Sequence, residues 1–135
     1  MSTAPDRTVE GPPRLLLVDD EPLLLRAVAR LLRIKGFEVH TAENGSVALL
    51  RLAERGFDLV LCDVRMPVMD GPTLLQTVRQ GQPEPPPFVF LTGYGDLSDR
   101  QLLAMGAQAV TSKPIDSAAL LDLIHRCRRA EGPRL

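Results

Sequence analysis

Residues 14–22 read Arg-Leu-Leu-Leu-Val-Asp-Asp-Glu-Pro, and the rest of the chain follows the pattern of this short stretch. The run from Arg14 to Val18 is apolar at every position after Arg14, which is typical of a strand buried on both faces of a parallel sheet. Two aspartates end the run. Pro22 stands where the first turn of a helix tolerates proline, with the acidic Glu21 before it near the positive end of the helix dipole. We therefore expect a strand, an acidic turn and a helix.

The same alternation of a short apolar run and an amphipathic segment repeats along the whole chain. The predicted strands are residues 14–18, 37–41, 57–62, 88–91 and 109–112. The predicted helices are residues 22–35, 46–55, 72–80, 97–105 and 116–129, and Gly36, Gly56 and Gly106 end three of them. Strands alternating with helices across short loops predict an open α/β domain, in which a parallel sheet has right-handed crossovers and helices on both faces.

The length and composition restrict the function classes. The chain has 135 residues, 44% of them hydrophobic, which fits one domain. A net charge of −1 gives no overall attraction to nucleic acid or to an anionic membrane. The two cysteines are too few for a disulfide framework, and the chain has neither a secretory signal nor an apolar run that could span a membrane. We expect a cytoplasmic domain at residues 14–129, with tails at 1–13 and 130–135.

Polar residues follow four of the predicted strands. Asp19 and Asp20 end the first, Asp63 the third, Thr92 the fourth and Lys113 the fifth. Ligands of open α/β sheets bind beyond the carboxyl ends of the strands, so these side chains are expected at one edge. Carboxylates gathered there repel one another, and hard oxygen ligands suit Mg²⁺. An ammonium and a hydroxyl nearby indicate a site for a phosphoryl group.

Each of these residues taken alone has a simpler explanation. Asp20 or Asp63 could cap a helix, Thr92 could be a turn residue, and Lys113 could be a surface charge. The combination is harder to explain that way, because four separate strand ends carry complementary chemistry.

The chain resembles the receiver domain of two-component response regulators, in the CheY-like superfamily. The resemblance covers about residues 14–129. It is carried by the stretches Val18-Asp19-Asp20-Glu21-Pro22, Asp63-Val-Arg-Met-Pro-Val-Met-Asp-Gly71, Leu91-Thr92-Gly93-Tyr94, Gly106-Ala107 and Lys113-Pro114. It implies a flavodoxin-like fold with the strand order 2-1-3-4-5.

The resemblance also implies roles for individual residues. Asp63 would accept a phosphoryl group from a phosphohistidine of a sensor histidine kinase or phosphotransfer protein, forming an aspartyl phosphate. Mg²⁺, or Mn²⁺ in its place, would be held by Asp19, Asp20, Asp63 and the backbone carbonyl of Arg65. Thr92 and Lys113 would contact the phosphoryl oxygens, and the bond from Lys113 to Pro114 would be cis.

The resemblance implies a structural role for other residues of the long motif. Pro67 and Gly71 would shape the loop after Asp63. Met66 and Met69 would pack, and Asp70 would cap the following helix.

One departure from the family concerns the switch that follows phosphorylation. Receivers usually carry an aromatic residue three positions before the lysine, and here that position is Val110. The usual coupling between Thr92 and an aromatic ring is therefore excluded, and we expect Tyr94 to report or replace that motion. The resemblance also implies a downstream protein partner on the face of the fourth helix, fifth strand and fifth helix, without direct binding of nucleic acid or membrane.

Two other functions remain open at this point. A magnesium phosphatase or phosphotransferase of the haloacid dehalogenase type would use an aspartyl intermediate on small substrates, but such enzymes carry a second acid where Arg65 stands. A constitutive pseudo-receiver would not need the full acidic set. We expect a phosphoacceptor that assists its own phosphorylation and dephosphorylation but is not an enzyme in the ordinary sense. If the chain is complete, it signals by contact; if it is a fragment, its effector lies beyond its ends.

Overall fold

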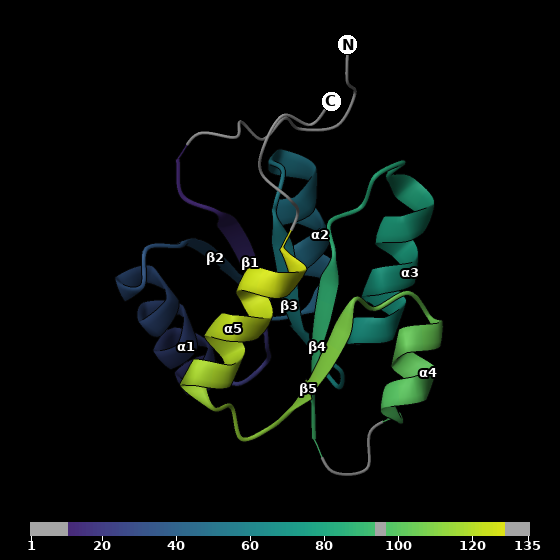
Figure 1. Cartoon of the computed structure of the whole chain (residues 1–135). Coiled ribbons are helices and arrows are strands. Elements are labelled where there is room, and N and C mark those ends of the chain that lie inside the picture. The colour runs from purple at the N-terminus through teal and green to yellow at the C-terminus, as the bar shows by residue number, and fades with distance from the viewer. Residues whose placement is uncertain (1–10, 94–96, 129–135) are drawn as a thin grey trace.

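The computed structural model describes residues 11–93 and 97–128, which form alternating strands and helices (Figure 1). The strands are β1 (Arg14–Val18), β2 (Glu38–Ala42), β3 (Leu59–Asp63), β4 (Phe88–Thr92) and β5 (Ala109–Ser112). The helices are α1 (Pro22–Ile34), α2 (Gly45–Glu54), α3 (Gly71–Gly81), α4 (Asp99–Ala104) and α5 (Ser117–Cys127). The predicted α/β class is confirmed, because every predicted strand and helix is present.

The five strands form one parallel sheet in the order β2-β1-β3-β4-β5, as expected. Leu15 of β1 lies between Val39 of β2 and Leu59 of β3, so the first and third strands are neighbours. Because all strands are parallel, their carboxyl ends share one edge, which is the lower edge in Figure 1. From β1 the chain adds β2 on one side and then β3 to β5 on the other, so the strand order reverses between β1 and β3, and a ligand site is expected at that place.

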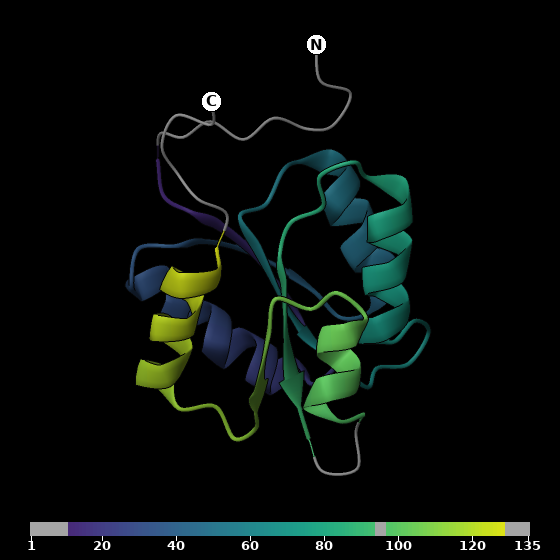
Figure 2. The ribbon, with the colours of Figure 1, turned by 45° about the vertical axis from the view of Figure 1, so that its right-hand side comes forward.

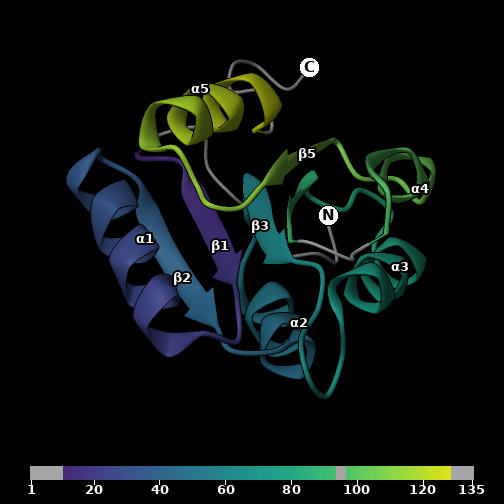
Figure 3. The same cartoon turned by 90° about the horizontal axis from the view of Figure 1, so that it is seen from below.

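Helices cover both faces of the sheet (Figures 2 and 3), and each layer has its own apolar core. Under α1 and α5 the core includes Leu17, Leu32 and Ile124; under α2, α3 and α4 it includes Val60 and Phe90. The three central strands β1, β3 and β4 are almost entirely buried, which explains their continuous apolar sequences. This packing fixes the strands, and so it fixes the positions of the residues at their carboxyl ends.

The structure shifts some predicted boundaries. The third strand begins at Leu59, and not at Phe57, because Asp58 turns back onto Arg14: the Asp58 carboxylate accepts the Arg14 N–H at 2.7 Å. It ends at Asp63, which pairs with Leu91 of β4. The fourth helix begins at Asp99 rather than residue 97, because Ser98 caps it.

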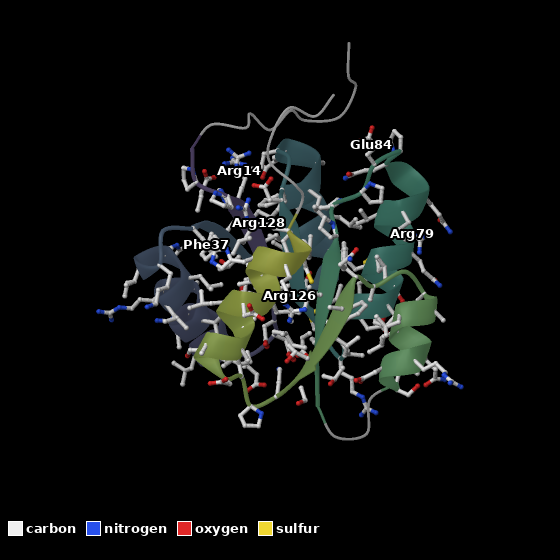
Figure 4. The ribbon with its side chains drawn as sticks, viewed as in Figure 1. Arg14, Phe37, Arg79, Glu84, Arg126 and Arg128 are labelled. Carbon is white, nitrogen blue, oxygen red and sulfur yellow. The ribbon has the colours of Figure 1, made fainter. Side chains whose placement is uncertain are left out.

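Arginines tie elements together away from the acidic edge. Arg14, labelled at the top of Figure 4, pairs with Glu38 at 2.7 Å and donates to the Gly56 carbonyl at 3.1 Å, so it links β1, β2 and the approach to β3. Arg79 on α3 donates to the last turn of α4 through the Met105 carbonyl at 2.7 Å. Within residues 11–93 and 97–128, no helix has both the length and the apolar character needed to cross a membrane.

Candidate functional site

Three carboxylates meet at the carboxyl edge of the sheet. Asp19 and Asp20 follow β1, and Asp63 is the last residue of the adjacent β3. One oxygen from each of the three lies within 4.8 Å of the others. Asp19 and Asp63 are only 2% and 7% exposed, whereas Asp20 is exposed. The edge therefore combines two buried carboxylates with one that solvent reaches.

The local backbone explains why Asp19 points into this cluster. Its N–H donates to the Ala42 carbonyl at 3.1 Å, which continues the β1–β2 ladder by one residue. Its carboxylate accepts the Glu21 N–H at 2.9 Å, which turns the chain into α1. Asp19 is thus fixed at its backbone by the sheet and at its side chain by the turn.

Lys113 completes the site from the other side. It follows β5 directly, and its N–H donates to the Thr92 carbonyl at 2.8 Å. Its ammonium lies 3.2 Å from Asp19 Oδ2 and 3.3 Å from Asp63 Oδ2. The peptide bond between Lys113 and Pro114 is cis, as the family resemblance implied. One cation therefore bridges both buried carboxylates.

The charges at this edge shift one another's protonation. Burial raises the pKa of Asp63 to about 6; Lys113 opposes that shift, and Asp19 and then Asp20 add to it. Burial lowers the pKa of Lys113, but Asp19 and Asp63 outweigh burial and leave the pKa raised. A carboxylate with a raised pKa in a group of acids is one that an added cation would stabilise.

Thr92 is the last residue of β4, which lies between the strand that ends at Asp63 and the strand that Lys113 follows. It is buried, and its hydroxyl donates to the Thr111 carbonyl of β5 at 3.4 Å. The structure therefore places Thr92 at the predicted edge with its hydroxyl directed to the neighbouring strand.

The loop from Val64 to Asp70 is held close to Asp63. The Gly71 N–H donates to the Val64 carbonyl at 2.9 Å, and the Asp70 carboxylate caps α3 by accepting the Thr73 N–H at 2.9 Å. Met66 and Met69 are half-buried and pack against the core, whereas Arg65 is exposed. The expected capping role of Asp70 and packing roles of the two methionines are confirmed.

Gly71 is required by close packing behind Asp63. A Cβ at this position would collide with the Asp63 carbonyl oxygen and would lie 2.7 Å from a ring carbon of Phe90. A backbone oxygen cannot move aside as a flexible side chain can. The glycine therefore lets α3 begin directly against the end of β3.

Of the two residues predicted for the switch, Val110 is among the residues that the structure describes and Tyr94 is not. Val110 lies in β5, is half-buried and packs against the core under α2, α3 and α4. Tyr94 falls outside the residues that the structure describes.

Sequence reasoning missed the position of Glu21. It was expected to act on the α1 dipole, and it does occupy the N-cap position, but its side chain makes no capping hydrogen bond. Its carboxylate instead lies 3.7 Å from the Lys113 ammonium. The signal available in the sequence was a third acid in succession after Asp19 and Asp20.

The donor set fits a magnesium ion. Asp19, Asp20 and Asp63 offer only carboxylate oxygens, which are hard ligands, and Asp20 leaves an exposed side for water or a phosphoryl oxygen. Cys62, the residue before Asp63, is fully buried and directs its thiol to the Asp63 carbonyl, so its sulfur is not directed into the cluster as a zinc ligand.

A parallel sheet of order 2-1-3-4-5 with an acidic cluster and a lysine at its carboxyl edge is the arrangement expected of a receiver. Residues 15–125 match the response regulator receiver domain family. The chain therefore belongs to the response regulator receiver domain family of two-component systems.

Individual relatives agree with this family. The chain is 36% identical over 123 residues to the transcriptional regulatory protein GlrR of Escherichia coli, covering 90% of this chain and 28% of that protein. It is 38% identical over 122 residues to a transcriptional regulatory protein CpxR homolog of Haemophilus influenzae, covering 89% of this chain and 52% of the relative. The chain thus spans about half or less of the length of these two regulators.

Solved structures show the same fold. The chemotaxis protein CheY4 of Vibrio cholerae has a TM-score of 0.78 and 31% identity, covering 87% of this chain and 99% of that one. A response regulator from Chloroflexus aurantiacus has a TM-score of 0.79 and 33% identity, covering 86% of this chain and 97% of that one.

Proposed function

We propose that this chain accepts a phosphoryl group on Asp63 and that the phosphorylated form binds its partners differently. The observation that carries the proposal is the bridge at the carboxyl edge, where Lys113 lies 3.2 Å from Asp19 and 3.3 Å from Asp63 beside the exposed Asp20. A nucleophilic carboxylate, a group of metal ligands and a cation for the phosphoryl oxygens are the parts that phosphoryl transfer to an aspartate needs.

In this proposal Asp63 is the nucleophile. A carboxylate oxygen forms a bond to phosphorus while the bond from phosphorus to the imidazole nitrogen of a phosphohistidine breaks, and that nitrogen keeps the electron pair. Lys113 turns from Asp63 toward the phosphoryl oxygens, because Asp63 loses most of its charge density to the new bond. Thr92 donates its hydroxyl to a phosphoryl oxygen in place of the Thr111 carbonyl. Positioning and electrostatics supply most of the rate.

Asp19, Asp20 and Asp63 would hold Mg²⁺, or Mn²⁺, with the backbone carbonyl of Arg65 as a further ligand. The bound ion would neutralise part of the negative charge that the carboxylates and phosphoryl oxygens share. Without such a cation the incoming anion would meet three carboxylates and a single ammonium. The exposed side of Asp20 supports this assignment, because it leaves room for ligands from solvent.

The phosphodonor in this proposal is a sensor histidine kinase or a phosphotransfer protein, and residues 14–129 form the unit that it recognises. The response is a change in binding at the face formed by α4, β5 and α5. Thr92 and Thr111 connect that face to the site, because the hydroxyl that would turn to the phosphoryl group now bonds to β5. Val110 cannot supply the aromatic rotation seen in most receivers, so movement of β5 itself carries the change.

The test is mass spectrometry of the intact chain after incubation with acetyl phosphate and Mg²⁺. Wild type is expected to gain one phosphate, and Asp63→Asn none. Omitting Mg²⁺ with a chelator should abolish labelling of wild type. Equal labelling of both proteins would place the acceptor elsewhere, and continuous phosphate release from unrelated phosphate esters would instead support a phosphatase.

A further inference from the structure

The side chain of Glu21 lies beside Lys113 and does not cap the helix that it precedes. It stands at the N-cap of α1, where a short polar side chain such as that of Asp or Ser commonly accepts a backbone N–H from the first turn. Here the side chain makes no such bond and remains 64% exposed, with Oε1 3.7 Å from the Lys113 ammonium. An exposed carboxylate is therefore kept beside the lysine of the site.

Lys113 does not need Glu21 as an ion-pair partner, because Asp19 and Asp63 already lie at 3.2 and 3.3 Å. Glu21 also lies outside the group of three carboxylates whose oxygens approach within 4.8 Å of one another. A cation held by that group would offset the charge of Asp19, Asp20 and Asp63 more than that of Glu21. The charge of Glu21 is thus left to act on whatever approaches Lys113.

Glu21 also lines a groove that reaches Lys113. A groove of about 710 Å³ runs between α1 and the start of α5, and its lining includes Glu21, Lys113 and Gly93. The groove is open to solvent, so a phosphodonor approaching Lys113 on this side passes the Glu21 carboxylate. A fixed negative charge at such an entrance repels a donor in proportion to the donor's own negative charge.

We propose that Glu21 is a specificity-determining residue that disfavours small, multiply charged phosphodonors. This inference rests on the proposed phosphorylation of Asp63. In the reaction with acetyl phosphate, an Asp63 oxygen bonds to phosphorus, the bond from phosphorus to the acetyl oxygen breaks, and acetate leaves with the electron pair. Glu21 takes no part in these bonds. It raises the free energy of the anionic donor near Lys113, and so it slows the entry of free acyl phosphates.

The size of the effect follows from Coulomb's law. A phosphoryl group in contact with Lys113 would lie about 7 Å from the Glu21 carboxylate, and in a water-like dielectric each donor charge would then change the rate about threefold at low salt. Acetyl phosphate carries about two negative charges near neutral pH and phosphoramidate about one. Neutralising Glu21 should therefore raise the initial rate of phosphorylation about ninefold with acetyl phosphate and about threefold with phosphoramidate.

The experiment compares the full wild-type chain with Glu21→Gln, which keeps the shape of the side chain and removes its charge. Initial rates of phosphate incorporation are measured by intact mass with each donor at saturating Mg²⁺, at ionic strengths of about 20 mM and about 1 M. We expect the ratio of the Glu21→Gln rate to the wild-type rate to be larger with acetyl phosphate than with phosphoramidate. At high salt this ratio should fall toward one, because the Debye length shrinks to about 3 Å.

Two further variants make the charge effect separable from a structural one. Glu21→Lys reverses the charge and should accelerate acetyl phosphate more than Glu21→Gln does. Glu54→Gln removes an exposed acid at the last residue of α2, where the chain has crossed back from the acidic edge, and should leave both rates unchanged. Calorimetric titration with Mg²⁺ in the absence of donor gives a second readout: Glu21→Gln should bind the ion more weakly, although it is phosphorylated faster.

The outcomes distinguish this inference from the proposed function. If wild type takes up no phosphate from either donor, the proposed function fails. If wild type is labelled on Asp63 but Glu21→Gln is accelerated equally with both donors, or not at all, or by the same factor at high salt, the role of Glu21 is overturned. An acceleration that is greater for the more charged donor and is lost at high salt supports it.

Discussion

The ammonium of Lys113 lies 3.3 Å from Asp63 Oδ2, although Lys113 follows β5, Asp63 ends β3, and the whole of β4 lies between these two strands. The lysine reaches over the end of the intervening strand, where Thr92 is the last residue. This bridge joins the two sides of the carboxyl edge. It also means that a change at Asp63 is felt directly by the loop that follows β5.

The raised pKa of Asp63 predicts a dependence of stability on pH in the metal-free protein. Its pKa in the folded state is about 6, against 3.8 as the ordinary value, mainly because of burial. Between these values the folded state binds more protons than the unfolded state, so this group's contribution to stability falls as pH rises from about 4 to about 6 and stays low above. Asp63→Asn removes the charge and should abolish that fall.

The corresponding measurement is urea unfolding in the presence of a chelator. At about pH 7.5, Asp63→Asn should raise the free energy of unfolding by about 1–3 kcal/mol relative to wild type. At about pH 4.5 the difference should shrink to less than about 1 kcal/mol, because wild type is then largely protonated at Asp63. A constant difference at both pH values would show that the effect is not electrostatic. Glu54→Gln, which alters an exposed acid, serves as the control.

Lys113→Met is expected to destabilise the metal-free protein. Removing the ammonium leaves the buried carboxylates of Asp19 and Asp63 without their shared cation, and breaking a buried ion pair costs about 3–5 kcal/mol. The loss should be smaller at about pH 5, where protonation relieves part of the repulsion. Lys35→Met, at an exposed position after α1, is the matched control in the same chemical unfolding series. Equal effects of the two substitutions would contradict the bridge.

Magnesium should stabilise the wild-type chain by binding the folded state. At ten times the dissociation constant, the gain is about 1.4 kcal/mol, or about 5 °C in melting temperature. Asp20→Asn should lose most of this shift, because it removes the exposed carboxylate of the cluster. Scanning calorimetry with NaCl at equal ionic strength separates binding from charge screening. A shift of the same size with NaCl would argue against a specific ion site.

Gly71 and Gly81 begin and end the same helix and should respond oppositely to alanine. At Gly71 a Cβ would collide with the Asp63 carbonyl oxygen and Phe90, so Gly71→Ala should cost about 1–3 kcal/mol through overpacking against the backbone. At Gly81 nothing lies within 4 Å of the added atom. Gly81→Ala should therefore be neutral or stabilise by up to about 1 kcal/mol.

Chemical unfolding of both glycine variants measures this contrast. Gly71→Ala should also weaken Mg²⁺ binding, because the backbone that must shift belongs to Asp63. If both variants unfold with the same free energy as wild type, α3 does not pack against the end of β3 as described.

Local sequence patterns predicted the elements well, because buried parallel strands are short apolar runs and surface helices repeat every 3.6 residues. The exact boundaries depend also on contacts between distant residues. Asp58 is a single polar residue between Phe57 and the apolar run from Leu59, and its contact with Arg14 delays the start of β3 until Leu59. Such a contact joins residues that are distant in sequence, and periodicity contains no information about it.

The sequence by itself indicated which polar residues lie at the carboxyl ends of the strands. An apolar run stops where a polar residue begins, and parallel strands bring their carboxyl ends to one edge, so Asp19, Asp63 and Lys113 could be assigned to a common site. Only the tertiary structure decided which groups touch and how strongly they are buried. The pKa of Asp63 and the approach of Glu21 to Lys113 depend on distances and solvent exclusion, which packing of the complete sheet and helices sets.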